Sequence, residues 1–133
     1  MSRTASREML RAKVHRPTVT QTNVNYEGSL TLDAALMNAA GMVPYERIDV
    51  YNCENGERFS TYLITGRAGS GEVCVNGAAA RLASPGDRVI IASYASIHEE
   101  QIPGHRPIVV LVDRENRIKS TRHEITAGTV VAG

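Results

Sequence analysis

A serine that directly follows a glycine, in the stretch Asn25–Ser29, is the feature of this chain with the most unusual chemical potential. A serine hydroxyl can attack the carbonyl carbon of the preceding residue where the backbone is strained, and glycine permits such strain because it has no Cβ. β-Elimination from the resulting ester leaves a dehydroalanine, which hydrolyses to a pyruvoyl group and ammonia. A Gly-Ser pair by itself says almost nothing, but this chemistry at the Gly28–Ser29 bond would give the chain its own electron sink for amino-acid decarboxylation, without an added cofactor.

Further polar side chains fall on one face of an expected strand over residues 58–65. Successive side chains of a strand point to opposite faces, so Arg58 and Tyr62 share a face while Thr61 lies on the other. An arginine can grip a carboxylate with two parallel hydrogen bonds, and a tyrosine hydroxyl can donate a proton. Thr61 would need a local twist, or the site of a neighbouring subunit, to join them.

Lys13 and His15 lie two residues apart on another expected strand, over residues 9–20, and so share a face. From the residues alone, Lys13 is an exposed strand lysine and His15 is a structural or interface histidine. No HExxH motif or paired-histidine spacing occurs. The remaining histidines are therefore expected on the surface and not as metal ligands: His98, His105 and His123.

Length and composition indicate one domain with an ordinary core. The chain has 133 residues, of which 42% are hydrophobic, and its net charge of +1 gives no reason to expect a nucleic-acid partner. No apolar run reaches membrane-spanning length and no secretory h-region follows the polar start, so a cytoplasmic location is expected. Cys53 and Cys74 form no metal-like cluster and are expected to be buried free thiols.

Short strands separated by turns dominate the expected secondary structure. Residues 1–8 are expected to be loose, and one helix is expected over residues 31–40, capped by Thr31 or Asp33 and ended by Gly41. Asn55-Gly56 predicts a two-residue hairpin turn, and residues 96–104 a polar loop. The other expected elements are strands over 47–53, 72–75, 88–95 and 107–113, a short helical turn at Ala78–Ala80, and a surface strand or frayed tail over 119–133. With Val, Ile, Leu and Ala for its core, the chain predicts a small mostly-β barrel.

Several ordered blocks resemble the pyruvoyl-dependent aspartate alpha-decarboxylases, over most of the chain from Met9 to about Pro107. The matching blocks are Lys13-Val14-His15-Arg16, Tyr26-Glu27-Gly28-Ser29, Asn55-Gly56 with Arg58-Phe59-Ser60-Thr61-Tyr62, Val75-Asn76-Gly77-Ala78-Ala79-Ala80, and Gly86-Asp87 with Val89-Ile90-Ile91-Ala92-Ser93. Two residues depart from the family: Asn25 stands where many relatives have histidine, and Tyr51 where tryptophan is frequent.

This resemblance implies a double-psi β-barrel with a few short helices, assembled as a homotetramer with sites between subunits. It implies self-cleavage between Gly28 and Ser29 into a short chain, 1–28, and a chain 29–133 that bears a pyruvoyl group derived from Ser29. Thr61 would stabilise the oxyanion of that cleavage and Tyr26 would shape the loop. A maturation factor is a further partner to consider.

The implied reaction is the decarboxylation of L-aspartate to beta-alanine and CO2 for pantothenate biosynthesis, through a Schiff base with the pyruvoyl group and with no metal or nucleotide cofactor. Tyr62 would protonate the carbon that loses CO2, while Arg58 and Lys13 would hold a substrate carboxylate. The resemblance also gives a pocket role to three further residues: Asn76, Ala78 and Ala79. Two alternatives stay open at this point, namely a pyruvoyl decarboxylase of another acidic amino acid such as glutamate, and an unprocessed barrel that only binds a carboxylate.

Overall fold

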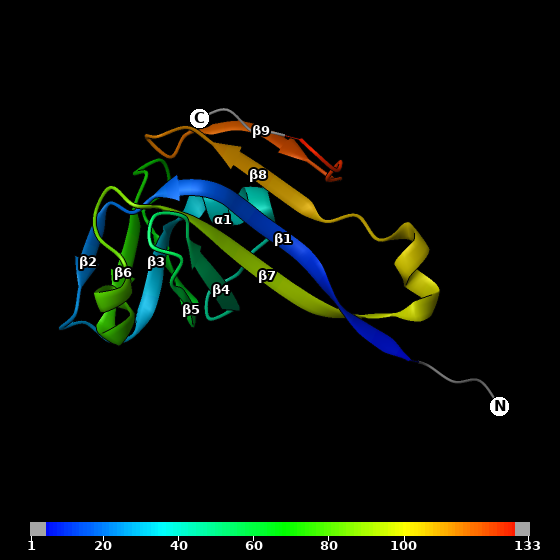
Figure 1. Ribbon diagram of the computed structural model, residues 1–133, viewed down its shortest axis with the longest axis horizontal. Helices are drawn as coiled ribbons and strands as arrows, with labels where there is room; N and C mark the ends of the chain where they lie inside the picture. Colours follow the sequence, from blue (N-terminus) through cyan, green and yellow to red (C-terminus); the bar gives the residue numbers. More distant parts are fainter. Residues whose placement is uncertain (1–4, 130–133) are drawn as a thin grey trace.

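Nine strands form one hydrogen-bonded sheet in the computed structural model, which describes residues 5–129 (Figure 1). Along the sheet the strands follow the order β2-β6-β3-β5-β4-β7-β1-β8-β9. The strand bounds are β1 Ser6–Thr18, β2 Gln21–Asn23, β3 Ser29–Asp33, β4 Arg47–Asn52, β5 Arg58–Gly66, β6 Val73–Asn76, β7 Arg88–His98, β8 Ile108–Val112 and β9 Ile118–Arg122. Three neighbouring pairs are parallel, β1 with β8, β2 with β6 and β3 with β5, and the others are antiparallel.

Within residues 5–129, three short helices accompany the sheet, and the mostly-β architecture confirms the expected fold class. They are α1 Ala34–Ala40, the 3-10 helix η1 Gly77–Leu82 and the 3-10 helix η2 Glu99–Gly104. The core is built almost wholly from aliphatic side chains, as the lack of Trp and the single Phe predict. Its largest fully buried members include Leu30, Leu32, Leu36, Ile48, Leu63 and Ile91. Alternation along the strands places five of these side chains on the inner face, and α1 supplies Leu36. Their burial is the main stabilising contribution.

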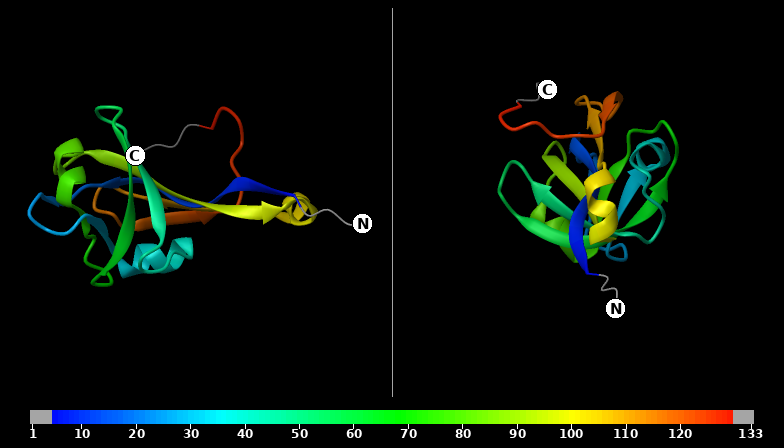
Figure 2. Two further views of the ribbon diagram at one scale, coloured as in Figure 1. Left: turned by 90° about the horizontal axis from the view of Figure 1, so that it is seen from below. Right: turned by 90° about the vertical axis from the view of Figure 1, so that its right-hand side faces the viewer.

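The ends of β1 and β7 form a long antiparallel arm that extends from the body of the molecule and carries η2 at its tip (Figures 1 and 2). Two expectations were wrong here: residues 6–8 are not loose, and residues 96–104 are not a simple loop. The register pairs Ser6 with His98, and the Glu99 backbone N–H donates to the carbonyl of Ala5 at 2.8 Å. Each segment supplies the backbone hydrogen-bond partners of the other, and the residue pattern within either segment alone could not reveal this pairing.

The expected helix over 31–40 begins three residues late, because Ser29–Asp33 is a strand. Leu30 and Leu32 are fully buried, and β3 lies between β5 and β6 with backbone partners on both sides. Asp33 is the N-cap of α1, and its carboxylate accepts a hydrogen bond from the Ala35 N–H at 2.8 Å. Gly41 ends the helix with φ +66°, as expected of a C′ glycine.

Asn55-Gly56 belongs to a longer connection than the expected two-residue turn. β4 ends at Asn52 and β5 begins at Arg58, and the Asn52 N–H donates to the Glu57 carbonyl at 2.9 Å. Side-chain oxygens stabilise this loop: those of Asn52 and Asn55 accept hydrogen bonds from backbone N–H groups two residues ahead. Such Asx turns compete with the tight hairpin, which explains why the dipeptide alone misplaces the turn.

Two side chains also depart from their expected exposure. Cys53 is exposed because it lies in the connection between β4 and β5, whereas Cys74 on β6 is buried as expected. His105 is half-buried, with its Nε2 2.7 Å from the carbonyl oxygen of Leu10. His98 and His123 are exposed, in agreement with the sequence.

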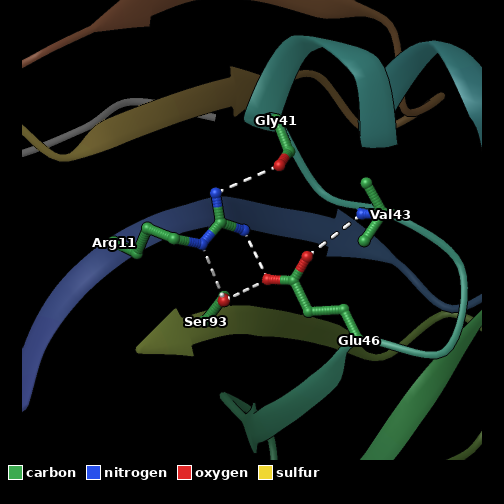
Figure 3. A network of polar contacts seen from close by, with 5 residues as sticks. All are labelled: Arg11, Gly41, Val43, Glu46 and Ser93. Atoms are coloured by element: carbon green, nitrogen blue, oxygen red, sulfur yellow. Dashed lines mark hydrogen bonds and ion pairs between the residues drawn. The ribbon is translucent and has the colours of Figure 1, made fainter. Parts of the chain in front are cut away.

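A polar network ties the start of β4 to β1 and β7 (Figure 3). The Arg11 guanidinium donates to the Gly41 carbonyl at 3.0 Å, to Ser93 Oγ at 3.2 Å and to the Glu46 carboxylate. Glu46 also accepts from the Ser93 hydroxyl and from the Val43 N–H, the latter at 3.0 Å. Burial alone would raise the pKa of Glu46, but the hydrogen bonds from Ser93, Val43 and Arg11 outweigh it and hold that pKa below its ordinary value.

Replacing Glu46 by glutamine is expected to lower the free energy of unfolding at pH 7 by about 1–3 kcal/mol, because the half-buried Arg11 loses its charged partner. A carboxylate whose pKa is depressed on folding contributes stability that is present above its unfolded pKa and is lost as pH falls. The difference in the free energy of unfolding between wild type and variant should therefore shrink as pH falls below about 4.5. Urea unfolding at one fixed protein concentration, from pH 7 to pH 3, measures this.

Glu99→Gln is the matched control, since Glu99 pairs with Arg7 on the exposed arm, where the two side chains are 50% and 69% exposed. That surface pair contributes at most about 1 kcal/mol. An equal loss in both variants, or a Glu46→Gln loss that does not change with pH, would contradict the assignment.

Candidate active site

Ser29 begins β3 and lies directly opposite Asn76, the last residue of β6. Its side chain is buried, with only 4% of the residue exposed. The Asn76 amide Nδ2 donates to Ser29 Oγ at 3.0 Å, and the Ser29 hydroxyl donates to the Glu27 carbonyl at 3.1 Å. Both hydrogen-bonding roles of the hydroxyl are therefore assigned, so its oxygen is held in one orientation next to the Gly28–Ser29 bond.

Asn76 is itself fixed by two neighbours that sequence reasoning missed. Its Nδ2 donates to Thr31 Oγ1 at 3.1 Å, and its Oδ1 accepts from the Cys74 thiol at 3.1 Å. Burial, and next the charge of Glu72, raise the pKa of Cys74, which keeps this thiol protonated and able to donate. Strand alternation could have identified both residues, because Thr31 lies two residues from Ser29 and Cys74 two residues from Asn76, so each shares a face with a site residue. For Thr31 this signal was lost, because a helix is expected over residues 31–40.

The residues before Ser29 form an exposed turn between β2 and β3. Tyr26 is 57% exposed, and its N–H donates to the Asn23 carbonyl at 3.4 Å. Gly28 is also exposed, whereas Ser29 and the next residue of β3 are buried. The Gly28–Ser29 peptide thus lies where the chain passes from surface to core, with the nucleophile on the ordered side.

Tyr62 is brought to the same place by the parallel pairing of β3 with β5. The register joins Leu30 to Leu63, so one residue earlier on each strand Ser29 neighbours Tyr62. Tyr62 is half-buried on the face opposite to Leu63. Thr61 points to the other face, beside its partner Ile48, so within one chain the structure does not bring it to Ser29 by strand alternation.

Arg58 lies four residues before Tyr62, which is about 13 Å along the strand. Its guanidinium lies over the ring of Tyr51, 4.9 Å from the ring centre. The Tyr51 hydroxyl shares a hydrogen bond with that of Tyr94 at 2.9 Å, and this bond, followed by burial, raises the pKa of Tyr51 to about 12. Tyr51 and Tyr94 also line a pocket of about 400 Å³. The guanidinium of Arg58 is therefore directed to a residue of this pocket on β4, on the opposite side of β5 from the strand of Ser29.

Lys13 and His15 share a face of β1, as expected, and line a small pocket of about 120 Å³ with Arg122. Burial, and next the positive charge of Arg122, lower the pKa of Lys13. Burial, followed by the charge of Lys13, lowers the pKa of His15 to about 4, so His15 is neutral at pH 7. In the strand order β5, β4 and β7 lie between β1 and β3, so neither Lys13 nor His15 is on a strand that pairs with the strand of Ser29.

Ala78 and Ala79 lie in η1, which begins directly after Asn76. This helix confirms the short helical turn expected at Ala78–Ala80. Ala78 is exposed, and Ala79 is half-buried against the core. Over residues 5–129, no three His, Cys, Asp or Glu side chains come close enough together to hold a metal ion. None of the helices within the same range has the length and apolar character needed to cross a membrane.

Comparison with known proteins gives consistent matches over nearly the whole chain. A family model described as aspartate decarboxylase matches residues 5–119. A protein named aspartate 1-decarboxylase from Syntrophobacter fumaroxidans is 57% identical over 111 residues, covering 84% of this chain and 90% of the relative. Proteins of the same name from Syntrophus aciditrophicus and a Geobacillus species are 54% and 49% identical, covering 85% and 94% of this chain and 97% and 98% of theirs.

Proposed function

The chain belongs to the aspartate decarboxylase family, and from this premise we propose that it is a self-processing, pyruvoyl-dependent enzyme. It is a carboxy-lyase that converts L-aspartate to beta-alanine and CO2 for pantothenate biosynthesis. The observation that carries the self-processing part is the buried Ser29 hydroxyl, held by Asn76 and Glu27 beside the Gly28 carbonyl. Relatives named for aspartate do not favour the alternatives of glutamate as substrate or of an unprocessed binding barrel.

In the first stage Ser29 is the nucleophile. Its Oγ attacks the Gly28 carbonyl carbon, the Gly28–Ser29 C–N bond breaks, and an ester with a free amino group replaces the peptide. Loss of the Ser29 Cα proton then breaks the Cβ–Oγ bond, so that residues 1–28 leave with a carboxylate. Tautomerisation and hydrolysis of the remaining dehydroalanine release ammonia. In this proposal Thr61 of a neighbouring copy stabilises the oxyanion and Tyr26 shapes the turn.

The residues around position 29 fit a pyruvoyl group. That group supplies an electron sink for the decarboxylation of an α-amino acid. Asn76 has an amide donor 3.0 Å from the Ser29 side chain, and the thiol of Cys74 fixes the amide in that orientation. An oxygen-bearing group at position 29 would therefore meet a hydrogen-bond donor that is already in place, beside the short η1 helix with Ala78 and Ala79.

Substrate binding is proposed to need a second copy of the chain. Arg58 offers a planar fork suited to a carboxylate, and Lys13 offers a second cation, but neither is next to Ser29 in the strand pairing of one chain. A homotetramer with sites between subunits would resolve this separation. Tyr62, beside Ser29, is the proposed proton donor to the carbon that loses CO2. A maturation factor and a cytoplasmic location complete the proposal.

The intact mass of the purified protein tests it. We expect two fragments, residues 1–28 and 29–133, with the longer one lighter by one ammonia than a chain that begins with serine. Sodium borohydride should reduce the new ketone and add two mass units, whereas a serine start would not change. An active preparation whose longer fragment keeps an intact amino group, or that retains only the full-length chain, would rule out the pyruvoyl mechanism.

A further inference from the structure

Gly77 lies against the backbone of Gly28, the residue that precedes Ser29. It is the first residue of η1, directly after Asn76, and has φ +76°. A Cβ placed on Gly77 would lie 2.5 Å from the Gly28 Cα, 2.7 Å from the Gly28 nitrogen and 3.3 Å from the Tyr26 carbonyl oxygen. The two shortest distances are to backbone atoms, so a side chain here could be accommodated only if the turn moved.

The contact is one-sided. A Cβ built on Gly28 would have no atom within 4 Å, and the neighbouring residues of the turn are exposed. Open space therefore lies on the side of the turn that faces away from η1, and Gly77 is the surface against which the turn packs. Asn76, one residue earlier, holds the Ser29 hydroxyl at 3.0 Å.

We propose that Gly77 is a positioning residue for self-cleavage: its missing side chain lets the Gly28 backbone lie against η1, where the Gly28 carbonyl is within reach of Ser29 Oγ. Asn76 positions the nucleophile and Gly77 positions the residue that is attacked. This inference rests on the proposed self-processing. It concerns the first chemical step alone, in which the Ser29 Oγ–Gly28 C bond forms, the peptide C–N bond breaks and the proton passes to the Ser29 nitrogen.

A displacement of about 1 Å at a reacting atom can lower a rate by about 100-fold. We therefore expect Gly77→Ala to slow self-cleavage by at least about tenfold, measured as full-length chain remaining over time in newly purified precursor. The variant should remain folded, because the clash falls on an exposed turn.

Gly56 provides a matched control, because it has the same φ of +76° and no atom within 4 Å of its would-be Cβ. Gly56→Ala therefore imposes the same backbone strain without the contact. It should self-cleave within about twofold of wild type. Equal rates in Gly77→Ala and wild type, or equal slowing in Gly77→Ala and Gly56→Ala, would overturn the inference. So would a Gly77→Ala chain that does not fold while Gly56→Ala does, since the clash would then reach the core.

Hydroxylamine supplies a readout that a general loss of stability would not change. It cleaves an ester by attack on the carbonyl, which leaves a hydroxamate on residue 28 and a serine-started chain from residue 29. If Gly77 acts on ester formation, hydroxylamine will not restore the fragments 1–28 and 29–133 in Gly77→Ala, as identified by their masses. Fragments at the wild-type level would place the defect after the ester and overturn the inference. A wild-type chain that never cleaves would instead refute the proposed self-processing itself.

Discussion

Ser29→Ala is expected to leave one full-length chain with no detectable aspartate decarboxylation. The substitution removes the only oxygen that can form the ester with Gly28, and with it the precursor of the pyruvoyl group. Only one atom is lost from a buried position, so Leu30 and the rest of β3 should keep their packing. Denaturing electrophoresis, intact mass and an assay of beta-alanine formation measure these outcomes on one preparation.

The loss of the hydroxyl leaves the Asn76 amide with one acceptor fewer, Thr31 Oγ1 being the one that remains. A modest loss of stability is therefore expected, on the order of 1 kcal/mol. Ser120→Ala is the matched control, because Ser120 is an exposed serine on β9. It should cleave and decarboxylate like wild type. Decarboxylation by uncleaved Ser29→Ala would show that the electron sink is not made from this residue.

Those parts of the candidate site that are made of residues adjacent in the chain could be predicted from sequence. Gly28–Ser29 and Asn76-Gly77 are short motifs whose chemistry depends on neighbours in the chain. Their meeting depends on the antiparallel pairing of β3 with β6, which joins residues 47 apart. Periodicity does not report such pairing. The start of α1 is misplaced for a different reason: Thr31 and Asp33 are both possible caps before a run of helix-forming residues, and only the structure shows that Asp33 is the cap and that Thr31 lies in β3.

The fold class followed from composition and short strands, but the arm and the strand order did not. Residues 6–8 are polar and residues 96–98 contain one apolar side chain, Ile97, so both segments look like loop in isolation, yet they pair with each other in the sheet. The placement of Lys13 and Arg58 could not be predicted for the same reason. Lys13 and Arg58 each lie on the strand face that alternation predicts. The strand order, which the sequence does not show, decides which other side chains lie next to that face.

Tyr62→Phe separates the two chemical stages and is expected to leave self-cleavage intact. The ring that packs beside β3 is retained, and the contacts that hold Ser29 come from Asn76 and Glu27, not from Tyr62. A positioned general acid contributes about 10²–10⁴-fold, so turnover of aspartate should fall by roughly that factor. The fall should appear in kcat, because the hydroxyl is assigned to proton donation and not to carboxylate binding.

The deciding measurement compares turnover with capture of the substrate. Borohydride in the presence of aspartate should attach substrate mass to the 29–133 chain as efficiently in Tyr62→Phe as in wild type, since binding precedes the step that needs the proton. Tyr45→Phe is the control, because Tyr45 is 76% exposed and its loss of a hydroxyl should change neither quantity. Near-normal turnover in Tyr62→Phe would reduce Tyr62 to a packing residue. If Tyr62→Phe loses both the capture of aspartate and its turnover, Tyr62 is a substrate-binding residue. The strand register that sets Tyr62 beside Ser29 fits either role, so only a variant that still captures aspartate supports proton donation.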